Sequence, residues 1–158
     1  MGEAGIDEFC KDADDERRGM CRVLKRWIAR LRGESFPAFR ELDVTAAPAV
    51  ADHVFVLDAT DDEGRWTVES CGIDVAAICR HQPVGRSVAE VFPMPLAEAL
   101  PHLSKNVMAY KKPISDSGSA YGPRGELLYR CILMPLSNDG QGIDRVLGSL
   151  TWRYVKDR

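Results

Sequence analysis

Cysteine and histidine have the widest chemical repertoire of the residue types here, and the sequence has five of the first and three of the second. The cysteines are Cys10, Cys21, Cys71, Cys79 and Cys131. Their number is odd and no two form a Cys-x-x-Cys pair, so the pattern indicates reduced thiols. We expect Cys79 and Cys131 to pack as small hydrophobic side chains, and a redox-sensing role for any of the five is the alternative.

The sequence contains no complete motif of the common catalytic sites. In Gly118-Ser119-Ala120-Tyr121-Gly122, alanine stands where a nucleophile elbow needs serine. The sequence has no Gly-x-Gly-x-x-Gly run and no phosphate-binding loop. The acidic pairs Asp14-Asp15 and Asp61-Asp62 fall in a predicted tail and a predicted turn, where solvated carboxylates are expected. We therefore predict that the protein is not an enzyme, and we assign no catalytic residue.

The composition is that of an ordinary globular protein. Of 158 residues, 45% are hydrophobic and 28% are charged, which is enough to bury one core without disulfides or metals. A net charge of -3 makes no general case for nucleic acid or an anionic membrane as a partner. No apolar run approaches the roughly 20 residues of a membrane span, and the acidic start lacks the order of a signal peptide. The expected location is the cytoplasm.

An amphipathic helix is predicted over Arg17–Arg32, after an acidic arm, residues 1–16, that we expect to be disordered. The apolar side chains of the helix recur at its period of 3.6 and form one stripe: Met20, Val23, Leu24, Trp27, Ile28 and Leu31. The other faces are basic. Three interpretations stay open, because such a stripe can cover its own domain, form a dimer or bind a membrane or partner.

A long antiparallel hairpin is predicted over Gly125–Val155, with a turn at Ser137–Gly142. In its second arm, polar residues alternate with apolar ones, which is typical of a half-buried strand. The apolar face carries Val146, Leu150, Trp152 and Tyr154. Gly148 belongs to the same face, where the missing side chain leaves room for a close approach.

The middle of the chain predicts a shorter hairpin over His53–Gly72, then a block of short helices. Ser87–Glu90 has the form of a capping box, and the longest of these helices is expected to begin or kink near Pro101. A weak strand follows over Ile114–Tyr121. Five strands with helices between them indicate an α+β fold, with one five-stranded antiparallel sheet and helices on one face.

The chain resembles a PAS domain from about His53 to Tyr154, both in the order of its elements and in individual residues. The resemblance is carried by Cys71-Gly72, by Pro83-Val84-Gly85-Arg86-Ser87 with Val91-Phe92, by Tyr110-Lys111-Lys112-Pro113, by Arg130-Cys131-Ile132-Leu133-Met134-Pro135-Leu136, and by Gly140 with Val146-Leu147-Gly148. With the preceding helix, the chain looks like the short stand-alone bacterial PAS proteins. The domains expected are a disordered acidic arm at 1–16, the amphipathic helix and linker at 17–52, and a PAS-like domain at 53–158.

The resemblance implies a sheet cupped around an apolar pocket, in a domain that senses a small molecule or docks a partner. The predicted ligand-binding residues are Cys71, Ile78, Val91, Phe92, Leu103, Val107, Ile132, Met134 and Leu150. Each would serve equally well in a filled core. PAS domains often form dimers through the helix before the domain, which gives a predicted homodimer interface at Val23, Leu24, Trp27, Ile28 and Leu31.

Neither haem nor flavin is expected as the cofactor. Haem would need an axial ligand on the long helix, and His102 stands at its predicted start without an anchor for the propionates. His53 and His81 do not form a metal-ligand set with each other. The light-sensing PAS branch carries an Asn-Cys-Arg-Phe-Leu run, to which Cys79-Arg80-His81 is only a remote approximation.

The leading hypothesis is a cytoplasmic signalling module, a homodimer, that acts on an unidentified signalling protein by protein–protein interaction. The alternative is a dedicated sensor of a small apolar or aromatic ligand. A small enzyme on a cupped α+β fold is the third hypothesis, and it would require ionisable side chains inside the pocket.

Overall fold

A computed structural model describes residues 10–11, 15–33, 35–44, 47–61 and 63–157. The predicted disorder of the acidic arm therefore falls mostly outside the described residues. The central element is a five-stranded sheet in the order β2-β1-β5-β4-β3. Its strands are β1 (Val54–Asp58), β2 (Thr67–Cys71), β3 (Ile114–Gly122), β4 (Gly125–Leu136) and β5 (Arg145–Tyr154). All neighbours are antiparallel, so the predicted α+β fold class is confirmed.

The long hairpin predicted at the C-terminal end is present as β4 and β5. Its register places Cys131 opposite Leu150 and Leu133 opposite Gly148. Residues directly opposite each other in an antiparallel pair share a face of the sheet. The apolar side chains expected on one face of β5 do lie together in one core cluster.

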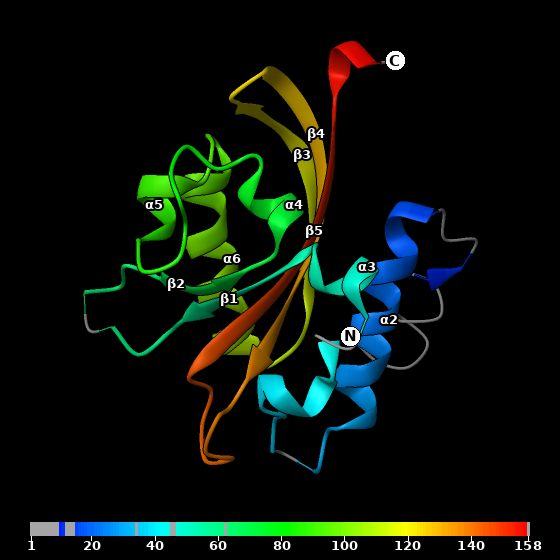
Figure 1. Ribbon diagram of the computed structural model, residues 1–158. Helices are drawn as coiled ribbons and strands as arrows, with labels where there is room; N and C mark the ends of the chain where they lie inside the picture. Colours follow the sequence, from blue (N-terminus) through cyan, green and yellow to red (C-terminus); the bar gives the residue numbers. More distant parts are fainter. Residues whose placement is uncertain (1–9, 12–14, 34, 45–46, 62, 158) are drawn as a thin grey trace.

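One side of the sheet, called here the inner face, is covered by α4 (Ile73–Ala76), α5 (Val88–Val91) and α6 (Leu96–Tyr110). These helices are green in Figure 1 and lie together on one side of the strands. The core between them and the sheet includes fully buried Phe55, Phe92 and Leu100. The inner face is therefore a continuous apolar core.

The opposite side, called here the outer face, is covered by α2 (Asp15–Ala29), η1 (Phe39–Leu42) and α3 (Pro48–Ala51). Figure 1 shows α2 and α3 on the other side of β5 from the green helices. The stripe of α2 packs there, with Met20, Val23 and Leu24 fully buried. The sheet thus has a core on each face, and the chain ends in η3 (Val155–Asp157).

The start of α6 and the cap of α5 differ from expectation, and the kink expected as the alternative at Pro101 stays a prediction. Helix α6 begins at Leu96, before Pro101, because Leu96 and Leu100 are fully buried and fix the first turns on the core. Ser87 does precede α5, but its hydroxyl bonds the Glu90 carboxylate (3.1 Å) and makes no bond to a helix amide. Pro101 stands sixth in α6 and has no amide hydrogen to donate to the Ala97 carbonyl, so the burial of Leu96 and Leu100 has to offset that missing bond.

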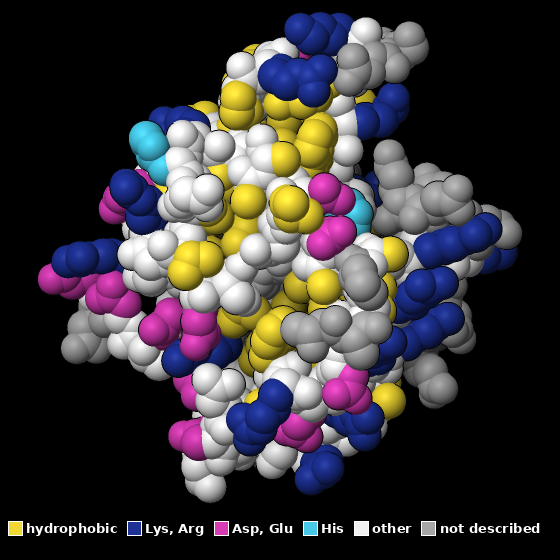
Figure 2. Space-filling model, viewed as in Figure 1, with side chains coloured by type: hydrophobic (Ala, Val, Ile, Leu, Met, Phe, Trp, Pro, Cys, Tyr) yellow, Lys and Arg dark blue, Asp and Glu magenta, His cyan; other side chains and the backbone are white. Residues whose placement is uncertain are grey.

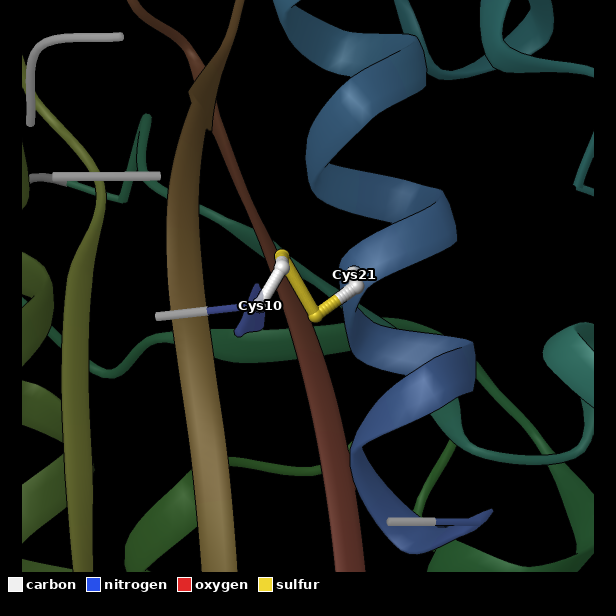
Figure 3. The surroundings of a disulfide bond; sticks show 2 residues. All are labelled: Cys10 and Cys21. Atoms are coloured by element: carbon white, nitrogen blue, oxygen red, sulfur yellow. A yellow bond between two sulfur atoms is a disulfide. The ribbon is translucent and has the colours of Figure 1, made fainter. Parts of the chain in front are cut away.

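The expectation of reduced thiols was wrong for two of the five cysteines. Cys21 of α2 forms a disulfide with Cys10, and Figure 3 shows this bond beside the helix. Their Cα atoms are 5.8 Å apart, within the normal range for a disulfide. No sequence pattern indicates this bond, because a separation of 11 residues matches no known pairing motif.

Candidate functional site

The inner core is the place where the resemblance predicted a ligand pocket. Seven of the nine predicted ligand-binding residues lie on the inner face: Cys71, Ile78, Val91, Phe92, Leu103, Val107 and Leu150. Ile132 and Met134 lie on the outer face, in the cluster with α2. Those two therefore cannot line a pocket with Phe92, and their assignment is corrected. Side chains alternate along β4, so an error of one residue moves each of them to the other face.

Side chains fill the space between the sheet and the helices. Phe55 lies directly opposite Gly148 in the β1–β5 pairing, and its ring occupies the place that a side chain at Gly148 would take. The Phe55 and Phe92 ring centroids are 5.4 Å apart. Phe55, Phe92 and Leu150 have no accessible surface, so no void the size of a water molecule lies beside them. The close approach expected at Gly148 is thus made by Phe55.

This packing shifts the pKa values of the thiols on the inner face. Cys131 is fully buried, and burial raises its pKa to about 12, so that its thiol stays neutral. The hydrogen bond between the Cys71 and Cys79 side chains raises the pKa of Cys79, with burial adding to it, and lowers the pKa of Cys71. The burial expected of Cys79 and Cys131 is confirmed.

The five residues of the predicted dimer interface contact the protein's own sheet. Val23 and Leu24 are fully buried on the outer face, and Ile28 and Leu31 are partly buried there. Trp27 is 3% exposed, and its Nε1 donates a hydrogen bond to the Pro135 carbonyl at 2.7 Å. A dimer through the stripe would require α2 to leave the sheet or to exchange between chains. The homodimer stays a prediction.

A groove of about 830 Å³ lies where the C-terminal ends of α2 and α6 meet the β4–β5 loop. We call it the α2–α6 groove, and its walls include Trp27, Phe36, Met108, Tyr110, Lys111 and Lys112. Trp27 stacks on Phe36 at 6.1 Å, while Tyr110 is 68% exposed. The groove therefore combines aromatic surface with two exposed cationic side chains, a composition that suits recognition of an acidic segment.

The described residues contain neither a cluster of metal ligands nor a helix that could span a membrane. Within them, no group of three or more His, Cys, Asp or Glu side chains is placed to hold a metal ion. Of the helices that the structure describes, none is long and apolar enough to cross a bilayer. His102 lies in the second turn of α6 and is exposed, whereas His53 contacts Asp74 just before β1.

Comparison with known proteins identifies similar folds among solved structures but no relative by sequence. No protein-family model matches the chain, and no curated protein matches it. The PAS domain of the fruit-fly ELK potassium channel matches with a TM-score of 0.53 and 13% identity, over 72% of this chain and 96% of that one. An RNA-binding light-oxygen-voltage receptor matches with a TM-score of 0.52 and 12% identity, over 72% of this chain and 32% of the receptor.

These structures share the sheet and helix order described above, at identities too low to transfer a function. They agree with the resemblance to a PAS domain that the order of the elements indicates. The chain has the fold of a PAS domain.

Proposed function

We propose that the protein is a non-catalytic PAS-type signalling module that acts by binding a partner protein at the α2–α6 groove. The observation that carries the proposal is the contrast between this groove and the inner core. The inner core has no accessible surface at Phe55, Phe92 and Leu150, whereas the groove exposes Tyr110 beside two lysines. A PAS fold whose interior is filled with its own side chains is suited to docking a partner protein on its surface, because it has no room for a ligand inside.

The partner that fits the groove is an acidic segment carrying an apolar or aromatic side chain. Lys111 and Lys112 are exposed cations, which attract carboxylates over distances of about 10 Å. Phe36 is half-buried and stacks on the buried Trp27, so Phe36 supplies the aromatic surface on which an apolar side chain would pack. A partner seated here would contact the C-terminal ends of α2 and α6 and the β4–β5 loop together.

Photo-crosslinking from two matched tyrosine positions tests this proposal. Tyr110 and Tyr121 are 68% and 67% exposed, but only Tyr110 lines the groove. A benzophenone amino acid replaces each in turn in the full chain, expressed in its native host. We expect one discrete crosslinked protein from position 110 and none from position 121. Lys112→Glu should abolish that product by reversing the charge of the groove.

Two results would overturn the proposal. The first is equal crosslinking from both positions, which would show contact without a site. The second is a product from position 110 that survives Lys112→Glu unchanged, which would show that an acidic partner is not recognised by the groove.

The alternative function is sensing of a small apolar or aromatic ligand at the inner face. It is favoured by one observation, that seven of the nine predicted pocket residues do gather there. A ligand would have to displace Phe55 or Phe92 from its place, at the cost of the contacts between them. Mass spectrometry of protein denatured directly after purification would detect a stoichiometric compound.

A further inference from the structure

Two of the three free cysteines lie together on the inner face. Cys71 is the last residue of β2 and Cys79 follows α4, so the segment between them contains that helix. Cys71 stands opposite Phe55 in the β1–β2 register and packs against the inner core, to which Cys79 belongs. A hydrogen bond joins the two thiol side chains. The two sulfur atoms are therefore neighbours in space.

The two thiols differ in their exposure. Cys71 is partly buried, whereas Cys79 is only 8% exposed. The segment that joins them reaches the molecular surface, because Ile73 is 69% exposed and Ala77 is exposed as well. Figure 2 shows hydrophobic side chains at the surface over α4. Of the pair, Cys71 is thus the thiol that a small solute meets first.

The contact between the thiols also makes Cys71 the more reactive one. The hydrogen bond from Cys79 outweighs burial and lowers the pKa of Cys71 from 9.0, which increases its thiolate fraction near neutral pH. The thiolate is the form of cysteine that attacks an oxidant. Cys131, on the same face, is fully buried and its pKa is raised to about 12. An accessible thiol of lowered pKa beside a second thiol is typical of redox-sensing cysteines.

We propose that Cys71 and Cys79 form a reversible oxidation site for hydroperoxides, in which Cys71 reacts first and Cys79 completes a disulfide. The Cys71 thiolate attacks one oxygen of the peroxide, and the O–O bond breaks. Cys71 becomes a sulfenic acid and, with hydrogen peroxide, hydroxide leaves. The Cys79 sulfur then attacks the sulfenic sulfur, and the S–O bond breaks. The hydroxyl group leaves with the Cys79 proton as water, so that the peroxide has taken two electrons from the two thiols.

The disulfide would tie the end of β2 to the segment after α4. It would close a short loop that contains the whole of α4. This helix also contacts β5, since the Trp152 indole donates a hydrogen bond to the Asp74 carbonyl oxygen at 2.7 Å. Exchange with a small thiol would reduce the bond and restore both cysteines. The inner face would thus have two covalent states that differ at its junction with α4.

Peptide mass spectrometry of the full chain tests this inference. The protein is reduced, desalted and treated with hydrogen peroxide in excess, and its remaining thiols are blocked with iodoacetamide in denaturant before cleavage by trypsin. Cleavage after Arg65 and Arg80 leaves both cysteines in one peptide, Trp66–Arg80. The other cysteines fall in separate peptides, because Lys11, Arg22 and Arg130 intervene. We expect Trp66–Arg80 to lose two hydrogen atoms and to carry no blocking group, and dithiothreitol to reverse both changes.

Cys131 is the matched control within the same molecule, and its peptide should stay blocked throughout. Cys79→Ser keeps a hydrogen-bond donor beside Cys71 but removes the second thiol, so dimedone should trap Cys71 as a sulfenic acid. Cys71→Ser should slow the oxidation of Cys79 by about tenfold or more. The rate of disulfide formation should rise with pH and reach half its maximum below pH 9.0, because the pKa of Cys71 is lowered from that value.

Three results would overturn the inference. One is a Trp66–Arg80 peptide that carries two blocking groups after peroxide treatment. Another is oxidation of Cys131 as fast as that of Cys71, which would show that the site has no selectivity. The third is a sulfinic or sulfonic acid at Cys71 while Cys79 remains a free thiol. The inference does not rest on the proposed partner binding, because neither thiol lines the α2–α6 groove.

Discussion

The two faces of the sheet bury similar kinds of side chain but differ in what they leave accessible. On the inner face, Phe55 fits over Gly148 and the aromatic side chains meet without a void. Along the outer helix α2, a groove opens at one end and a second pocket at the other. The inner face is thus closed by its own side chains, whereas hollows open along α2, and the partner binding proposed above uses one of them.

The largest effect expected concerns the attachment of α2 to the outer face. Trp27→Ala removes a nearly fully buried aromatic ring and leaves the Pro135 carbonyl without its 2.7 Å donor. The free energy of unfolding should fall by about 3–5 kcal/mol, as measured in urea. Trp27→Phe keeps most of the ring and loses only the N–H, so it should cost about 1–2 kcal/mol.

If Trp27→Ala lowered the free energy of unfolding by less than about 1 kcal/mol, the contrast between the two faces would be contradicted, because α2 would then be only loosely attached to the outer face. It would also favour the alternative that the stripe of α2 serves a dimer. Sedimentation of the same variant distinguishes these cases by reporting the oligomeric state directly.

A smaller effect is expected on the inner face, at Gly148. Gly148→Ala places a methyl group where the Phe55 ring lies, and overpacking of this kind costs about 1–3 kcal/mol. Phe55→Leu in the same chain should recover part of the loss, which a double-mutant cycle measures. Gly142→Ala, with no atom near its added methyl group, is the control and should change stability little. Additive effects at Gly148 and Phe55 would show that the inner face is not tightly packed.

The smallest effect concerns the ion pairs at the edge of the sheet, where Arg145 contacts Asp58 (3.4 Å) and Glu69. Burial acts to raise the pKa of Asp58, but hydrogen bonds from Thr60 and the charge of Arg145 outweigh it and lower that pKa from 3.8. A carboxyl whose pKa is lower in the folded state stabilises the fold above its unfolded pKa. This contribution is lost as the pH falls through the folded value.

Arg145→Met should therefore lower stability by less than about 1 kcal/mol at pH 7, because the partners are partly exposed. The difference from the unmodified protein should shrink as the pH falls below 3.8, the reference value for Asp58. Urea midpoints measured from pH 7 to pH 2 check this. A difference that grows on acidification would contradict the assigned direction of the Asp58 pKa.

The two strands of the long hairpin show how far the sequence could predict this structure. In β5, polar residues alternate with Val146, Leu150, Trp152 and Tyr154, and these four do share the inner face as predicted. The strand is not half-buried as expected, because the outer core buries Leu147, Ser149 and Thr151 as well. Strand β4 is apolar on both faces from Cys131 to Leu136, and no alternation indicated which side Ile132 and Met134 occupy. The order of elements was therefore predictable, but the membership of the pocket was not.

The hollows along α2 could not be predicted because their residues are distant in the sequence. The second pocket joins residues 18–22, 49–53 and 151–152, and only the packing of α2 on the sheet brings them together. Similarly, the sequence predicts that a helix ends near Tyr110 and Lys111, but only the fold places these residues in one groove with Trp27. The disulfide between Cys10 and Cys21 depends in the same way on the course of the chain.

Mass spectrometry of the full chain, denatured directly after purification from its native host, tests most directly the claim that the inner face is a packed core. We expect that no apolar or aromatic compound accompanies the chain in stoichiometric amount. Phe92→Trp serves as the control, because a larger side chain would exclude any ligand from the same place. One compound per chain in the unmodified protein, lost in Phe92→Trp, would contradict the account and identify the inner face as a sensor pocket.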